Sequence, residues 1–447
     1  MNTAELRRPR ALVTAATVSL VVLAAQWLPV SANGGDPLID TLGSVRSTLD
    51  KYGISLGLQS TDEVFGNPNG GRAQGATFDG QSALGLGIDL DKAIGLQGGI
   101  FNIGAFQNYG HGISATNIDN LSLVSNIEAT RSARLYELWY QQSFFGGVVD
   151  VRLGQLGADE EFMITRYGAW FINNAFGWPT LPSVDLPAGG PSFPLATPGI
   201  RLRAIPAEPL TLLLAAFNGD PAGPGLGNPQ LRDASGTLFR LGDGVFTIAE
   251  AQWAIDNRKN SGGPPITLKV GGWYHDKATP NQFFATDRLT SVSPASAGSP
   301  IARKEWSGYA VADVMLLPQP NGKGGLAVFA RVDGASAPRS KVSAELAAGI
   351  VYQGPFNRAG DNFGFAVDSA RIGDPLGSVG ALASEYRFHG YETVLELSYQ
   401  IQALPWLQVQ PDFQYVITPG GGIPNPNRPG QLVGSAAVFG LRIVAAF

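Results

Sequence analysis

The sequence predicts an all-β fold, an antiparallel β-barrel whose outer face lies against lipid. Every second residue of the last segment is apolar, namely Phe439, Leu441, Ile443, Ala445 and Phe447. The residues between them are small or charged, and this period of two is typical of a strand with unlike faces. Only 15% of all residues are charged, whereas soluble domains have about 25%. Much of the surface therefore need not meet water.

The N-terminus predicts export from the cytoplasm. A basic stretch, MNTAELRRPR, is followed by the apolar stretch ALVTAATVSLVVLAAQWLPV and by the small-x-small sequence VSA at residues 30–32. This order is typical of a secretory signal peptide, so we expect residues 1–32 to be removed. A retained membrane anchor is the alternative, which Gln26 and Pro29 disfavour. Without residues 1–32 the chain has 28 basic and 35 acidic residues, a net charge of −7, so no nucleic-acid partner is expected.

Beyond the N-terminus, no stretch approaches the about 18 consecutive apolar residues of a membrane helix. An exported chain can then cross a membrane only as a closed sheet, because lipid offers no partner to backbone N–H and C=O groups. A mature length of about 415 residues, at about 22–28 residues per strand and connection, gives about 15–19 strands, of which we expect 16. The chain has no Cys, which excludes a disulfide framework and a thiolate metal site.

A short helical segment is expected over residues 33–52, before the barrel. The sequence IDTLGSVRSTLDKYG places apolar residues at spacings of three and four and ends at Gly53, a typical helix stop. The barrel then occupies residues 53–447. Its first strand, GISLGLQST, is expected to begin near Gly53 and to pair with the last one.

Alternating segments recur along the barrel region. They are RLYELWYQQ, VVDVRLGQL, TLKVGGWYHD, GLAVFARVDG, AELAAGIVYQ and a hairpin over residues 391–418. In RLYELWYQQ the pattern places Tyr136 with Leu138 on the lipid side and Glu137 on the other side. The longest irregular stretch, residues 173–199, is rich in Gly and Pro. It either folds inward as a constriction or remains an external loop.

The polar faces of these segments supply candidates for a channel lining, namely Glu137, Trp139, Arg152, Trp273, Arg331, Glu392 and Glu396. Carboxylates and guanidinium groups hydrogen-bond to hydroxyl groups, and aromatic faces can stack on sugar rings. For any single residue, a wall residue that pairs with a neighbour is the favoured alternative. Glu137 and Arg152 are the best candidates, because they lie on adjacent predicted strands just before the long stretch.

The chain resembles the carbohydrate-selective porin family of the OprB type nearly end to end. The matching stretches include NPNGGRAQGATFDGQSALGLGIDLDKAIGLQGG, LYELWYQQSFFGGVVDVRLGQL, FINNAFGWP and YETVLELSYQIQALPWLQVQPDFQYVITPGG. The resemblance implies a 16-stranded outer-membrane barrel through which neutral sugars, monosaccharides such as glucose, diffuse passively. It also implies that GLRIVAAF is the signal for the outer-membrane barrel-assembly machinery. Trimers are common among porins, while this family includes monomeric channels.

Three other functions remain open at this point. A general or ion-preferring diffusion porin would share the fold without sugar selectivity. An outer-membrane barrel hydrolase would need a nucleophile and a base, but the chain has only three His and no GxSxG or HExxH motif. A secreted soluble β-lectin would carry charges on both strand faces, unlike the hairpin at 391–418. No enzyme activity, cofactor or metal is therefore expected.

Overall fold

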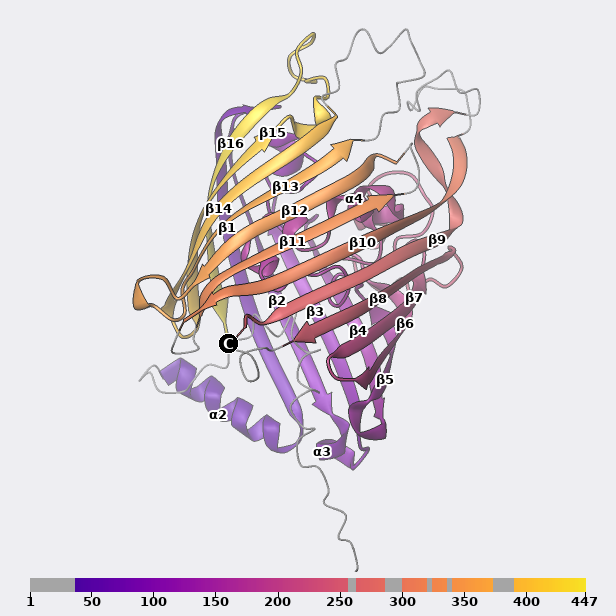
Figure 1. Ribbon diagram of the computed structural model, residues 1–447, viewed down its shortest axis with the longest axis vertical. Coiled ribbons are helices and arrows are strands. Elements are labelled where there is room, and N and C mark those ends of the chain that lie inside the picture. The colour runs from indigo at the N-terminus through magenta and orange to yellow at the C-terminus, as the bar shows by residue number, and fades with distance from the viewer. Residues whose placement is uncertain (1–36, 256–262, 286–299, 320–323, 336–339, 373–389) are drawn as a thin grey trace, which may run out of the picture.

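In the computed structural model the chain forms a closed antiparallel barrel of 16 strands, as predicted (Figure 1). The structure describes residues 37–255, 263–285, 300–319, 324–335, 340–372 and 390–447. The predicted signal peptide, residues 1–32, lies outside these ranges. The strands are β1 (Ile54–Gly71), β2 (Gly75–Asp89), β3 (Gly99–Gly110), β4 (Ser132–Phe144), β5 (Val149–Leu156), β6 (Thr197–Ala207), β7 (Leu210–Asn218), β8 (Val245–Ile255), β9 (Ile266–Ala285), β10 (Pro300–Pro318), β11 (Gly325–Ala335), β12 (Val342–Gln353), β13 (Asn362–Ile372), β14 (Tyr391–Leu404), β15 (Leu407–Ile417) and β16 (Gly434–Ala446).

Each strand pairs with the next, and the last strand closes the barrel against the first. In that closing pair Gln59 lies opposite Ala446 and Glu63 lies opposite Arg442. The backbone N–H of Phe447 also donates to the carbonyl of Leu58 at 2.8 Å. The terminal segment that alternates in the sequence is therefore a paired strand without a free edge.

The helices are short and lie outside the wall or in its connections. They are α2 (Pro37–Lys51), α3 (Leu90–Ile94), α4 (Thr180–Asp185) and α5 (Pro229–Arg232). Helix α2 lies beside the barrel end that carries the C-terminus, and Arg46 donates to the carbonyl of Leu56 at 3.1 Å. No helix in the described ranges is both long and apolar enough to cross a membrane.

The two ends of the barrel differ in their connections. The end with the C-terminus has short turns, such as residues 405–406 between β14 and β15. The opposite end has long connections, among them residues 111–131, 157–196 and 219–244. In outer-membrane barrels the short turns are periplasmic and the long loops are extracellular, which sets the orientation used below.

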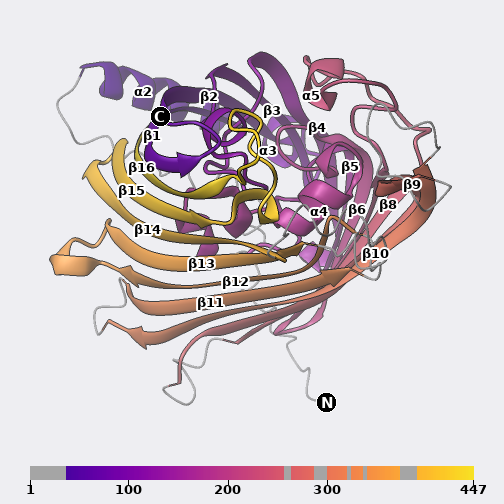
Figure 2. The same cartoon turned by 90° about the horizontal axis from the view of Figure 1, so that it is seen from above.

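Two of the long connections fold into the barrel. Figure 2 shows α4 and the neighbouring coils inside the ring of strands. We call residues 157–196 the inner loop and residues 111–131 the second loop. Apolar side chains of both are fully buried, for example Ile118, Ile172 and Phe176. The inner loop begins at residue 157, well before the irregular stretch that the sequence marks at 173–199.

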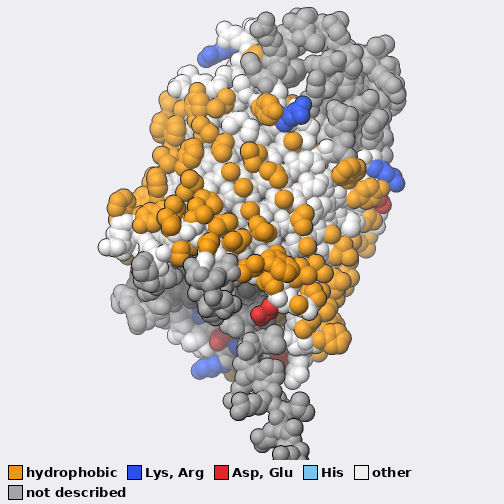
Figure 3. Space-filling model, in the orientation of Figure 1, with side chains coloured by type: hydrophobic (Ala, Val, Ile, Leu, Met, Phe, Trp, Pro, Cys, Tyr) orange, Lys and Arg blue, Asp and Glu red, His pale blue; other side chains and the backbone are white. Residues whose placement is uncertain are grey.

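The outer wall is apolar, as Figure 3 shows for the face in view. Exposed side chains on the outer wall as a whole include Leu153, Leu214, Val270 and Ile350. Asp62 is an exception, because its neighbours Thr61 and Glu63 are buried inside and its own carboxylate points outward. It accepts hydrogen bonds from Tyr109 at 2.8 Å and Ser60 at 3.1 Å, which satisfy a carboxylate on a wall that faces lipid.

The prediction that Tyr136 faces lipid is wrong. The β3–β4 register passes from Glu137 to Leu135 and leaves Tyr136 unpaired, the mark of a β-bulge. The bulge turns the ring inward, where Tyr136 is 4% exposed and its hydroxyl donates to Asp159 at 2.7 Å. A side chain predicted to contact lipid therefore contacts the inner loop instead.

Candidate functional site

Wall carboxylates hold the inner loop and the second loop by their backbone N–H groups. Glu396 on β14 accepts from Ile172 at 2.6 Å and from Asn173 at 3.0 Å. Glu345 on β12 accepts from Thr180 at 3.0 Å and from Leu181 at 2.7 Å. Asp313 and Glu392 bind N–H groups in the same way, at Arg166 and Tyr167 and at Leu121 and Ser122 respectively. Hydrogen bonds to charged groups are the strong ones, so these residues, which we call the clamp carboxylates, fix where the loops lie.

Arginines of the wall, among them Arg331 and Arg442, bind oxygen atoms of the loops. Arg331 on β11 donates to the carbonyls of Met163, Ala175 and Gly177. Arg442 on β16 pairs with Glu63 and donates to Asn126 at 2.6 Å in the second loop. Carboxylates of the wall thus bind backbone N–H groups of the loops, and arginines of the wall bind loop oxygen atoms.

A buried charge cluster lies where β5 and β6 meet the start of the inner loop. Arg152 pairs with Glu161 at 3.0 Å, and Arg201 pairs with Glu161 at 2.7 Å and with Asp150. The Arg152 guanidinium also lies 3.9 Å from the centre of the Trp139 ring. This cluster ties the first residues of the inner loop to the wall.

Glu137 borders that cluster, where it accepts a hydrogen bond from Asn102 at 3.1 Å. Burial and the Glu137 charge raise the pKa of Glu160 in the inner loop well above its usual range. Such a shift favours a neutral, proton-bearing carboxyl at Glu160.

All seven residues proposed from the sequence face the lumen, but the loops cover them. Each is at most 4% exposed: Glu137, Trp139, Arg152, Trp273, Arg331, Glu392 and Glu396. Glu137 and Trp139 lie on β4 and Arg152 lies on the adjacent β5, so the predicted adjacency of the Glu137 and Arg152 strands is confirmed. Arg331, Glu392 and Glu396 hold loops, and Trp273 packs against Phe246 with ring centres 5.9 Å apart. Their role as direct sugar contacts stays a prediction.

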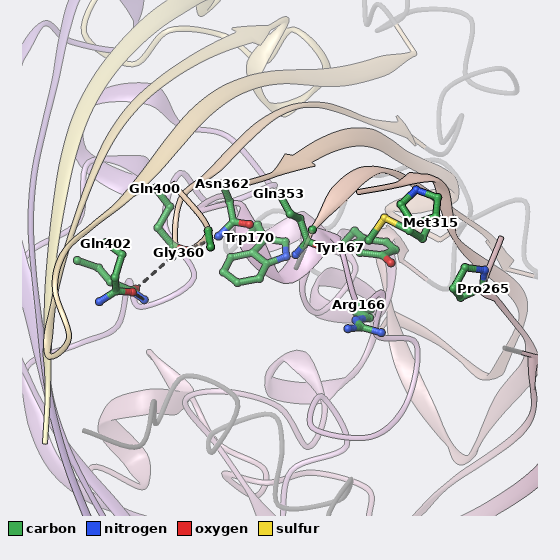
Figure 4. Close-up of a pocket in the computed structure, with 14 residues that line it drawn as sticks. Arg166, Tyr167, Trp170, Pro265, Met315, Gln353, Gly360, Asn362, Gln400 and Gln402 are labelled. Atoms are coloured by element: carbon green, nitrogen blue, oxygen red, sulfur yellow. Dashed lines mark hydrogen bonds between the residues drawn. The ribbon is translucent and has the colours of Figure 1, made fainter. Parts of the chain in front are cut away.

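An open pocket lies beneath the inner loop, toward the periplasmic turns. It has a volume of about 380 Å³ (Figure 4). Its polar and aromatic lining consists of Arg166, Tyr167, Trp170, Gln353, Asn362, Gln400, Gln402 and Gln408. The inner loop supplies the first three residues and strands β12 to β15 or their turns supply the others. None of the seven residues named from the sequence lines it.

The carboxamide groups of the pocket form a chain of hydrogen bonds. Asn362 donates to Gln400 at 3.1 Å, Gln400 to Gln408 at 3.2 Å, and Gln408 to Gln402 at 2.9 Å. A carboxamide has two donors and an acceptor oxygen, so each group keeps capacity for a solute. The signal in the sequence is the run of Gln on the polar face of the hairpin at 391–418.

The pocket holds no metal-ligand cluster of the usual kind. Within the described ranges, His, Asp and Glu form no group of three or more that could hold a metal ion. The lining instead combines hydrogen-bonding carboxamides with the Trp170 indole, which suits a polyhydroxylated solute.

A 16-stranded barrel with an apolar outer wall, infolded loops and a polar pocket in its lumen is an outer-membrane porin. Residues 73–447 match the carbohydrate-selective porin, OprB family, and the chain belongs to that family. It is therefore a sugar-selective channel of the outer membrane and not an enzyme.

Individual relatives agree with this assignment. Porin B of Pseudomonas aeruginosa is 24% identical over 434 residues, which cover 91% of this chain and 90% of the relative. The high-pH structure of Pseudomonas putida OprB has a TM-score of 0.78 at 22% identity and covers 91% of this chain and 97% of that one. The low-pH structure of the same protein has a TM-score of 0.53 at 20% identity, covering 91% and 96%. At these identities the structures support the fold alone.

Proposed function

We propose that the channel passes monosaccharides such as glucose by diffusion and that the pocket beneath the inner loop is where the sugar is selected. The single observation that carries this proposal is the pocket itself, about 380 Å³ in volume and lined by carboxamides and by Trp170. Small-molecule sites are typically about 300–1,000 Å³ in volume, so the pocket is large enough for one sugar ring.

The lining suits both faces of a sugar. Hydroxyl groups can exchange hydrogen bonds with the chain of carboxamides, which both donate and accept. The Trp170 indole offers a flat apolar surface to the C–H groups of the ring, and its backbone carbonyl is fixed by Gln410 at 2.9 Å. A sugar can therefore replace its hydrogen bonds to water with contacts to the pocket at little net cost in free energy, which a passive channel requires.

The seven residues named from the sequence are proposed to act on this pathway. Arg331, Glu392 and Glu396 hold the loops that shape it, and Glu137, Trp139 and Arg152 anchor the start of the inner loop. Trp273 supports this arrangement from the buried cluster that includes Phe246 and Tyr309. This supporting role accounts for the burial of the seven side chains.

We also propose that residues 1–32 are a cleaved signal and that the barrel-assembly machinery recognises the last strand. Phe447 supports the second point, because its ring stacks on Trp406 at 5.7 Å at the periplasmic end. The aromatic terminus is thus part of the closing strand rather than a loose tail.

The proposed function is tested by liposome swelling with purified protein. We expect glucose to enter faster than a zwitterionic solute of similar size, and Trp170→Ala to remove most of that preference. The matched control is Trp253→Ala, because Trp253 is an exposed residue of the outer wall on β8. Equal entry of both solutes into wild-type liposomes would contradict sugar selection.

A further inference from the structure

One cation of the pocket has no carboxylate partner. Arg166 is exposed in the inner loop, and its guanidinium takes part in no ion pair or side-chain hydrogen bond among the described residues. Its one side-chain contact of note is with the Tyr167 ring, whose centre lies 5.7 Å from the guanidinium carbon. In the labelled view of the pocket, Arg166 stands apart from the carboxamides (Figure 4).

The other lumen arginines are satisfied, which makes Arg166 different from them. Arg152, Arg201 and Arg442 are paired with carboxylates, and Arg331 binds three backbone carbonyls. Asp313 lies beside Arg166, but its two oxygens accept the backbone N–H groups of Arg166 and Tyr167 at 3.1 and 3.3 Å. The Arg166 side chain is therefore left for a solute.

The residues that line the pocket with Arg166 carry no opposing charge. Its lining in the described part of the chain contains no Asp and no Glu. A site for neutral sugars alone has no need of an unpaired guanidinium. The neighbouring carboxylate, Asp313, is buried and accepts backbone N–H groups, so the exposed Arg166 guanidinium can attract a negatively charged solute. A guanidinium also matches a carboxylate in shape, because two parallel N–H groups can bind its two oxygens.

We propose that the pocket also takes monosaccharides that carry a carboxylate, the uronic and aldonic acids, and that Arg166 binds the carboxylate while the carboxamides and Trp170 bind the rest of the sugar. The inference rests on the proposed function, since it assigns an additional substrate class to the same pocket. Arg166 is then a specificity-determining residue, one that separates acidic from neutral sugars without being needed for neutral ones.

The test is the flux of labelled glucuronate and glucose into proteoliposomes that contain the full-length porin. We expect the wild-type protein to pass both sugars. Arg166→Gln should lower the glucuronate flux relative to the glucose flux about tenfold, which corresponds to about 1.4 kcal/mol. Arg166→Lys should retain most of the glucuronate flux, and higher salt should weaken the preference of the wild-type channel.

A matched control removes a cation outside the pocket. Arg371→Gln changes an exposed residue of β13 that faces away from the lumen, so both fluxes should stay unchanged. A wild-type channel that passes glucose and excludes glucuronate would overturn the inference and leave the proposed function intact. So would an Arg166→Gln variant whose two fluxes change equally. A wild-type channel that passes neither sugar faster than a zwitterion of similar size would contradict the proposed function itself.

Discussion

Replacing Glu396 tests whether the clamp carboxylates hold the inner loop in place. Glu396 is fully buried on β14 and accepts two backbone N–H groups, from Ile172 at 2.6 Å and from Asn173 at 3.0 Å. Glu396→Ala leaves both donors without a partner, and each unsatisfied buried donor costs about 1–3 kcal/mol. The lower end, about 2 kcal/mol in total, applies if lumen water reaches the freed groups. That loss shifts the ratio of attached to detached loop about 30-fold, at about 1.4 kcal/mol per factor of ten.

The assay is single-channel recording in a planar bilayer. We expect the wild-type channel to carry a steady current and Glu396→Ala to fluctuate to larger conductance, because a detached loop widens the lumen. Glu396→Gln keeps one acceptor oxygen and should give a smaller effect. Asp333→Asn is the matched control, since Asp333 is a buried wall carboxylate whose oxygens have no hydrogen-bond partner in the described ranges. A Glu396→Ala current as steady as the wild type, or an equal effect of Asp333→Asn, would refute the reasoning.

Three further predictions concern the loops. Arg152→Ala removes the ion pair with Glu161 and should raise conductance or alter sugar block while the barrel stays folded by circular dichroism; unchanged current would place Arg152 outside the constriction. Burial, then the charge of Asp79, raises the pKa of Glu128 to about 8 from 4.5, so the folded state holds a proton that the unfolded chain releases. The contribution of Glu128 to stability should be full below about pH 4.5 and be lost as the pH rises through about 8, and denaturant unfolding of Glu128→Gln should show a weaker fall over this range. Gly236→Ala adds a Cβ 1.9 Å from the Leu135 carbonyl oxygen at a φ of +67°, and the left-handed backbone costs a further about 1–2 kcal/mol. We expect residues 219–244 to detach from β4 in this variant, which faster protease cleavage within these residues would report.

Strand periodicity explains why the barrel is predictable. In the segment at 391–418, alternation continues over enough residues to define both strands, and the structure places β14 and β15 there with a two-residue turn. Each side chain alternates because successive Cβ atoms point to opposite faces of a sheet, so a local pattern is sufficient. The closing strand follows from the same rule.

The bulge and the loop contacts are not local, and for that reason the sequence does not predict them. An extra residue at Tyr136 reverses its side, and nothing in RLYELWYQQ distinguishes a bulged strand from a regular one. The pattern correctly predicts Glu392 and Glu396 as inward residues, but their partners in the second loop and the inner loop lie more than two hundred positions away in the chain. Alternation with a period of two shows which side chains of a strand face the lumen, but it does not show which loop covers them.

The sequence pattern does not identify the residues that line the pocket, for a related reason. Gln400, Gln402 and Gln408 alternate as polar positions of the hairpin, but nothing in the sequence separates them from charged and aromatic residues, which can also contact sugars. Trp170 and Arg166 come from the inner loop, where no periodicity marks a side chain as inward. The spatial meeting of this loop with the Gln run appears only once the loop is folded into the barrel.

Whether the pocket beneath the inner loop selects sugars can be decided from the single-channel current of the purified protein while glucose is titrated in. We expect discrete current steps that fall with glucose in a saturable way, because each sugar that occupies the pocket beneath the inner loop obstructs the ions. Current steps that are indifferent to glucose and to other sugars would contradict a sugar-selecting pocket in this channel.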